Sequence, residues 1–321
     1  MTLRRFVGSL VLAAIVAAIV VVANTLAGGA MRFAGVQIGG GVAADPNYVP
    51  AGAPLGMIGS DPDDPDDPWS AAAPPGGVIL QTPGPLASPN ATGTLRIPIP
   101  KNAPTGPRRV GIQVGHWKTD EAPDELRRLI PQTGAAWENV TEVDINLDIA
   151  QRVSVILNAK GIAVDVLPVT IPVGYTADAF VALHADSDGV GENSGFKMAH
   201  SARRGPYEDS LLNDIKDSYA AATGLDYDAT HVSRNMTGYF GMNWSRFQHA
   251  VSAHTPAVIL EMGYVSNDDD RALMLDRADT VANGIANGIM KFLAETPRSK
   301  IFGQDLVVPA FPSRPIRTPA P

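Results

Sequence analysis

The sequence predicts an α/β fold: a single three-layer domain with a mixed, largely parallel sheet flanked by helices. Short apolar runs alternate with longer stretches of helical spacing over residues 108–295, a pattern typical of strands connected by helices. Hydrophobic residues make up 45% of the 321-residue chain, which supports one sizeable core, and there is no internal repeat. An N-terminal hydrophobic segment and a disordered linker are expected before this domain.

Each element is expected from its local pattern. The strands are predicted at residues 110–114, 162–167, 179–183, 196–200 and 257–260. The helices are predicted at residues 144–160, 206–223 and 269–293, with a helical turn at 124–130 and a loop at 132–140. The first helix has the clearest pattern, because apolar residues recur every three or four positions from Ile145 to Leu157 and Gly161 stands just past its end.

Residues 1–30 are predicted to form an export signal or a membrane anchor. Arg4 and Arg5 precede an apolar run at residues 6–23, and a basic flank followed by an apolar core is typical of both kinds of segment. The run has about 18 residues, near the minimum that crosses a bilayer, and we favour a retained anchor. Either interpretation places the remainder of the chain outside the cytoplasm.

Proline, glycine, alanine and aspartate dominate residues 31–107, and residues 61–68 read DPDDPDDP. Repeated prolines and like charges favour an extended, solvated chain, so these residues are predicted to be a linker that holds the catalytic domain away from a membrane. Residues 296–321 are also proline-rich and are predicted to be a C-terminal tail.

The composition excludes several kinds of site. A formal net charge of −8 argues against nucleic acid as a partner, because phosphate binding needs clustered lysine and arginine. The chain has no cysteine, which excludes disulfides, a thiol nucleophile and a cysteine-ligated metal. Any metal ion must therefore be held by histidine, aspartate or glutamate.

Three of the predicted strands end in a titratable residue, namely His116, His184 and Glu261. Ligands of α/β sheets collect at the carboxyl ends of strands, so these side chains are candidates to converge there. Glu142, just before the predicted helix, is a fourth candidate. A lone residue of this kind is more often structural. Glu142, for example, could simply be a carboxylate in the first turn of the helix, where it stabilises the helix dipole. The combination of two histidines and two glutamates without cysteine favours a metal site.

Four segments, in order, resemble the zinc-dependent N-acetylmuramoyl-L-alanine amidases of the Amidase_3 type, which act on peptidoglycan. The matching segments are Val114-Gly115-His116, Glu142 to Leu147 (EVDINL), Ala182 to Asp186 (ALHAD) and Pro256 to Asn267 (PAVILEMGYVSN). The last is the most specific, and the resemblance covers residues 108–293. It implies a bacterial cell-wall enzyme that hydrolyses the amide between N-acetylmuramic acid and L-alanine during wall turnover, lysis or cell separation.

Carried over by position, the resemblance implies a zinc ion held by His116, Glu142 and His184, with Glu261 as the catalytic carboxylate. This division agrees with the chemistry of zinc, because three protein ligands leave one position open for water. Trp117, Arg234 and Asn267 are candidate substrate-binding residues. Trp117 is a candidate either to stack on a sugar or peptide or to plug the sheet edge, and Arg234 and Asn267 are candidates to line the cleft.

Some features depart from the family pattern and leave alternatives open. Trp117 and Lys118 replace the usual glycines after His116, and Asp186 replaces the usual asparagine; Asp186 is a candidate to orient a zinc-binding histidine. A zinc peptidase or deacetylase acting on another wall component, and a wall-binding or regulatory module without turnover, are the competing hypotheses. A protein activator is also left open, as is a lid formed by residues 118–140.

Overall fold

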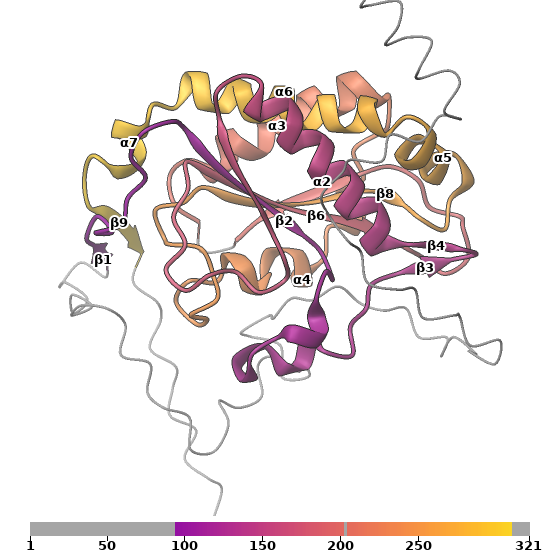
Figure 1. Ribbon diagram of the computed structural model, residues 1–321, viewed down its shortest axis with the longest axis horizontal. Coiled ribbons are helices and arrows are strands. Elements are labelled where there is room, and N and C mark those ends of the chain that lie inside the picture. Colours follow the sequence, from indigo (N-terminus) through magenta and orange to yellow (C-terminus); the bar gives the residue numbers. More distant parts are fainter. Residues whose placement is uncertain (1–93, 202–203, 310–321) are drawn as a thin grey trace, which may run out of the picture. The chain divides into compact units, whose positions relative to one another are not determined.

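The computed structural model describes residues 94–201 and 204–309 (Figure 1). The predicted anchor at residues 1–30, most of the predicted linker and the last residues of the predicted tail lie outside these ranges. Within the described ranges, no helix combines the length and the apolar character that crossing a membrane requires.

A five-stranded sheet forms the centre of the domain, in the order β5-β2-β6-β8-β7. The strands are β2 (Arg109–Val114), β5 (Ala163–Leu167), β6 (Ala179–Asp186), β7 (Lys197–His200) and β8 (Ala257–Tyr264). The first four in the sheet order are parallel, and β7 pairs antiparallel with β8. The predicted fold class, a mixed and largely parallel sheet flanked by helices, is therefore confirmed.

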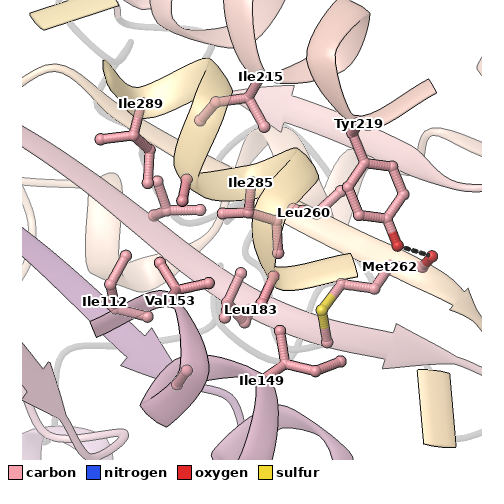
Figure 2. Packing of buried hydrophobic residues seen from close by; sticks show 14 of the residues in the cluster. Ile112, Ile149, Val153, Leu183, Ile215, Tyr219, Leu260, Met262, Ile285 and Ile289 are labelled. Atoms are coloured by element: carbon pink, nitrogen blue, oxygen red, sulfur yellow. Dashed lines mark hydrogen bonds between the residues drawn. The ribbon is translucent and has the colours of Figure 1, made fainter. Parts of the chain in front are cut away.

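Three long helices cover one face of this sheet, as Figure 1 shows: α2 (Glu142–Asn158), α3 (Glu208–Thr223) and α6 (Ala278–Glu295). Their apolar positions, spaced to lie on one side of each helix, meet alternate residues of the strands. Figure 2 shows this packing, with Ile149 of α2 and Ile285 of α6 close to Leu183 and Leu260 of the sheet. The phenol of Tyr219 donates a 2.6 Å hydrogen bond to the carbonyl of Met262, which attaches α3 to β8.

The opposite face is covered by short segments instead of long helices. These are the 3-10 helices η2 (Asp124–Leu129) and η4 (Phe240–Met242), the short helix α4 (Arg234–Thr237) and the loops around them. Leu126 and Leu129 of η2 are fully buried against this face. Because strand side chains alternate between faces, Gln113, His184 and Glu261 project toward this loop-covered face, while Leu183 and Leu260 project toward the long helices.

Several element boundaries differ from the prediction. The first helix begins at Glu142, not Asp144, because the Thr141 side chain caps the backbone N–H of Asp144. The predicted loop at 132–140 contains a small hairpin, β3 (Ala136–Trp137) with β4 (Val140–Thr141).

The predicted last helix is in fact two helices, α5 (Asp268–Asp276) and α6, because Arg277 leaves the helical conformation between them. Three 3-10 helices and the short helix α4 also lie in stretches without a predicted element. The 3-10 helices are η1 (Thr119–Glu121), η3 (Ala229–His231) and η4.

Ordered structure extends past the predicted domain boundaries at both ends. The strand β1 (Thr94–Ile97) lies in the predicted linker, and both α7 (Arg298–Phe302) and β9 (Leu306–Pro309) lie in the predicted tail. β1 pairs antiparallel with β9, and apolar side chains of this pair pack with Ala253, just before β8. Sequence reasoning missed the pairing because each strand has only four residues and its partner lies more than two hundred positions away.

Candidate metal centre and active site

The three predicted metal ligands come together at the carboxyl ends of the parallel strands. His116 follows β2, His184 lies in β6 and Glu142 begins α2. The connection from β2 leads to β5 on one side, whereas β6 lies on the other side of β2, so the strand order reverses between β2 and β6. This reversal is where α/β sheets usually bind ligands.

His116 is held in a left-handed backbone conformation, with φ of 61°. Its Nδ1 lies 2.8 Å from the backbone carbonyl of Gln132. A carbonyl oxygen only accepts hydrogen bonds, so the proton of the neutral ring sits on Nδ1. The unprotonated Nε2 then faces Glu142, 3.4 Å from its Oε2.

Glu142 is buried, and backbone donors hold both of its carboxylate oxygens. Oε2 accepts a hydrogen bond from the N–H of Ala135 at 2.8 Å, and Oε1 accepts one from the N–H of Ala185 at 3.2 Å. Burial alone would raise the pKa of Glu142, but positive charge at the positions of His116 and His184, together with the Ala135 N–H, lowers it to about 2. The carboxylate therefore stays charged at neutral pH and is available as a ligand.

His184 is only 2% exposed, and burial lowers its pKa. Its Nδ1 lies 3.0 Å from Oε1 of Glu142, and its Nε2 lies 3.3 Å from the hydroxyl of Tyr239. The ring packs directly on Gly115, where a β-carbon would lie 2.5 Å from Cε1 of His184. Glycine is required at position 115 because any side chain would displace the histidine.

The donor set fits a metal ion. Ligand atoms of His116, Glu142 and His184 all lie within 4.8 Å of one another. The unprotonated nitrogen of His116 and the carboxylate of Glu142 are both electron-pair donors, and they face each other with no proton to share. Two imidazoles, one carboxylate and no sulfur are typical of a catalytic zinc site with an open fourth position.

Glu261 lies beside this cluster on the neighbouring strand, paired in register with His184. It lies in the middle of an eight-residue strand rather than at its end, as the sequence had suggested. It is 1% exposed, and within the described residues neither carboxylate oxygen has a hydrogen-bond partner. Burial, together with Asp186 and Glu142, raises the pKa of Glu261 well above its ordinary value, although Lys197 opposes this shift. An unpaired buried carboxyl with a raised pKa is suited to transferring protons.

Asp186 contacts a lysine and not a histidine. Its carboxylate accepts hydrogen bonds from the ammonium of Lys197 and from the N–H of Ser187. Lys197 is 1% exposed and stands opposite Glu261 in the register of β7 and β8. The prediction that Asp186 orients a zinc-binding histidine is therefore wrong, and Lys197 is a functional candidate that sequence reasoning missed.

The three candidate substrate-binding residues differ in their surroundings. Trp117 is half-buried against the helix-covered core cluster, next to His116. Arg234 is exposed at the first position of α4. Asn267 caps α5, where its side-chain oxygen accepts hydrogen bonds from the N–H groups of Asp269 and Asp270. The structure leaves all three as predictions.

The candidate lid at residues 118–140 is part of the scaffold. Glu125 accepts hydrogen bonds from the backbone N–H groups of Gln248 and His249, and Leu126 is fully buried. The same segment supplies the Gln132 carbonyl to His116 and the Ala135 N–H to Glu142. A β-carbon on Gly134, whose φ is 84°, would lie 2.9 Å from Glu142. The segment therefore supports His116 and Glu142, and its role as a lid stays a prediction.

Tyr239 and Gln113 are further residues that the sequence prediction missed. The Tyr239 hydroxyl donates a 2.7 Å hydrogen bond to Oε1 of Gln113, and both side chains are buried. Gln113 had a visible signal, since it is a polar residue inside an apolar strand. Tyr239 had none, because it comes from a segment without regular periodicity.

Comparison with known proteins gives one family and a set of similar structures. The sequence model of the Amidase_3 family, described as N-acetylmuramoyl-L-alanine amidase, matches residues 110–291, more than half of the chain. No match was found among curated proteins.

The similar solved structures include the following two amidases. The catalytic domain of an N-acetylmuramoyl-L-alanine amidase from Bacillus (Paenibacillus) polymyxa var. colistinus is 23% identical, with 59% of this chain and 99% of that chain covered and a TM-score of 0.38. The apo form of the N-acetylmuramyl-L-alanine amidase from Mycobacterium abscessus is 20% identical, with 59% and 100% covered and a TM-score of 0.46.

Proposed function

The chain belongs to the Amidase_3 family of N-acetylmuramoyl-L-alanine amidases, and we propose that it hydrolyses the amide between N-acetylmuramic acid and L-alanine of peptidoglycan in a zinc-dependent reaction. His116, Glu142 and His184 would hold the zinc ion. One observation carries this proposal: Glu261, a buried carboxylate without a hydrogen-bond partner among the described residues, lies beside three side chains whose ligand atoms converge.

Zinc bound there would supply Lewis acidity, which polarises the scissile carbonyl and makes water easier to deprotonate. Glu261 would accept the proton of the attacking water on a carboxylate oxygen and then donate it to the nitrogen of L-alanine as the C–N bond breaks. The raised pKa of Glu261 favours holding the proton between these two transfers. The products are a lactyl carboxylate on the sugar and a free amino group on the peptide.

We further propose that the enzyme works outside the cytoplasm, in wall turnover, lysis or cell separation. The basic flank and apolar run near the N-terminus support this location, whether residues 1–30 are retained as an anchor or cleaved.

The test is digestion of isolated peptidoglycan by the full-length chain loaded with zinc. Labelling of new amino groups and mass spectrometry of the products identify the bond that is cut. The Glu261→Gln variant is expected to lose this activity. Glu295→Gln, an exposed glutamate of α6, is the matched control and is expected to keep it.

The products separate the competing hypotheses. New L-alanine amino groups together with lactyl-terminated muramic acid support the amidase. New glucosamine amino groups would identify a deacetylase, and cleavage inside the stem peptide would identify a peptidase. Binding to peptidoglycan without any release, at full zinc occupancy, would identify a wall-binding module.

A further inference from the structure

A line of buried hydrogen bonds leads away from His184, on the side opposite the metal-ligand cluster. Nε2 of His184 lies 3.3 Å from the hydroxyl of Tyr239, and this hydroxyl lies 2.7 Å from Oε1 of Gln113. The amide Nε2 of Gln113 lies 2.8 Å from the backbone carbonyl of Val169. All four residues are buried, so their polar groups depend on these hydrogen bonds.

The far end of this line decides where each proton lies. The carbonyl oxygen of Val169 can only accept a hydrogen bond, so the NH₂ group of Gln113 must point toward it. The amide oxygen of Gln113 then points toward Tyr239 and needs a donor. The phenol has a single proton, and the 2.7 Å contact shows that the Tyr239 hydroxyl donates it in a hydrogen bond to Oε1 of Gln113.

The near end follows from this assignment. Because the single O–H of Tyr239 already donates a hydrogen bond to Gln113, the phenol oxygen can only accept a hydrogen bond from Nε2–H of His184. A neutral imidazole carries one proton, so Nδ1 is left with a lone pair. That lone pair faces the Glu142 carboxylate at 3.0 Å, which places two electron-pair donors together.

We propose that Gln113 and Tyr239 are positioning residues that hold the proton of His184 on Nε2, so that Nδ1 is the atom offered to the metal. The inference deepens the proposed function and rests on it for the identity of the metal as zinc. It also explains why a glutamine is buried in the strand that precedes His116. The NH₂ of its side-chain amide donates and the carbonyl oxygen of the same amide accepts, and this sets the direction of all the hydrogen bonds in the line.

The variants separate this role from simple packing. Tyr239→Phe removes the acceptor for Nε2–H. Gln113→Met frees the phenol proton, which can then be donated to Nε2 of His184 and favour the opposite tautomer. Without the phenol hydroxyl, however, Gln113 has no influence on His184, so adding Gln113→Met to Tyr239→Phe should cause no further loss.

The first measurement is zinc affinity of the full-length chain, by competition with a chelator. Each single variant is expected to bind zinc about 10–100-fold more weakly, as is typical when a partner of a metal ligand is removed. The double variant is expected to match Tyr239→Phe. Tyr175→Phe is the matched control, because this buried tyrosine donates to Asp165 near the opposite end of the sheet, and its zinc affinity should not change. Unchanged affinity in both single variants, or additive losses in the double variant, would overturn the proposal.

The second measurement locates the proton directly. In the zinc-loaded wild type with ¹⁵N-labelled histidine, the imidazole N–H of His184 is expected on Nε2, and a proton on Nδ1 would overturn the inference. Neither measurement depends on turnover. If the variants show the expected zinc affinities but the wild type does not cleave peptidoglycan, only the proposed function is contradicted. If the wild type cleaves peptidoglycan but the variants bind zinc as tightly as it does, only this inference is contradicted.

Discussion

Two carboxylates are buried at opposite ends of the same sheet, and their surroundings differ. Asp178, just before β6, is 0% exposed, and Glu261 in β8 is 1% exposed. Asp178 accepts hydrogen bonds from the backbone N–H of Arg109 at 2.7 Å and from Nε of Arg298 at 2.8 Å, and it forms an ion pair with Arg108 at 2.9 Å. Glu261 has no such partner among the described residues.

The difference distinguishes a structural charge from a chemical one. Removing a carboxylate from water is costly, and hydrogen bonds and counter-charges offset that cost at Asp178. At Glu261 no hydrogen bond from the described residues offsets that cost, and the charge of Lys197 opposes it only in part. This is typical of a group whose partners are supplied by substrate, water or a metal ion. The two ends of the sheet should therefore respond to mutation in opposite ways.

The largest effect is expected at Glu261. The Glu261→Gln substitution should lower kcat by about 10²–10⁴-fold, because it removes the group proposed to transfer protons. The free energy of unfolding should not fall, since no hydrogen bond or ion pair is lost. Steady-state assays on peptidoglycan fragments and urea unfolding measure the two quantities. A Glu261→Gln variant that loses stability but retains kcat would show that Glu261, like Asp178, has a structural role.

At Asp178 the opposite result is expected. Asp178→Asn should lower the free energy of unfolding by about 3 kcal/mol, the lower end for a broken buried pair, because the Arg108 and Arg298 side chains are still 24% and 23% exposed. Zinc affinity should be unchanged. Urea unfolding of the metal-free chain tests the first expectation, and a weakened zinc affinity would show that the two ends are coupled.

Gly111 in β2 and Gly115 just after it allow the same comparison between the two ends of the sheet. Gly115→Ala should weaken zinc binding about 10–100-fold by displacing His184, a metal ligand. Gly111→Ala, whose β-carbon would lie 2.8 Å from the Tyr175 hydroxyl, should lower stability by about 1–3 kcal/mol through overpacking, with zinc affinity unchanged. Chelator competition and urea unfolding on both variants separate these effects, and equal zinc affinities would contradict the prediction.

The smallest effect is expected at Asn267. Asn267→Ala should cost about 1 kcal/mol of stability because it removes the cap of α5, and Asn267→Ser should recover most of it. Thermal unfolding measures both. An increase in KM shared by the two variants would instead assign Asn267 a contact with substrate.

Much of the sheet, and the convergence of His116, Glu142 and His184, could be predicted because the signals are local. The apolar run before Glu261 marks a strand, and the motifs around His116, Glu142 and His184 are each contained in a few residues. The position of Glu261 within β8 was misjudged because a charged residue normally ends an apolar run. In this protein the strand continues through Tyr264, and the charge is buried.

What could not be predicted depends on contacts between distant segments. Tyr239 reaches His184 from a loop-rich region, and the phenol donates to Gln113, 126 positions earlier in the chain. The Asp186–Lys197 ion pair similarly depends on where β7 lies relative to β6 and β8. The local sequence of a strand does not determine its position in the sheet order. Side-chain partners of this kind require the assembled sheet.

The pairing of β1 with β9 has a practical consequence for handling the protein. Thr94 pairs with Pro309, so the described structure begins and ends at one place, where β1 and β9 lie side by side (Figure 1). This pair packs with Ala253, just before β8 begins, whereas His116 and His184 lie toward the carboxyl ends of their strands. A fusion partner joined directly at Thr94 or Pro309 would attach on the side away from His116 and His184. Joining the described domain to a surface at either of these two residues would therefore leave the side that carries His116 and His184 turned toward an insoluble polymer.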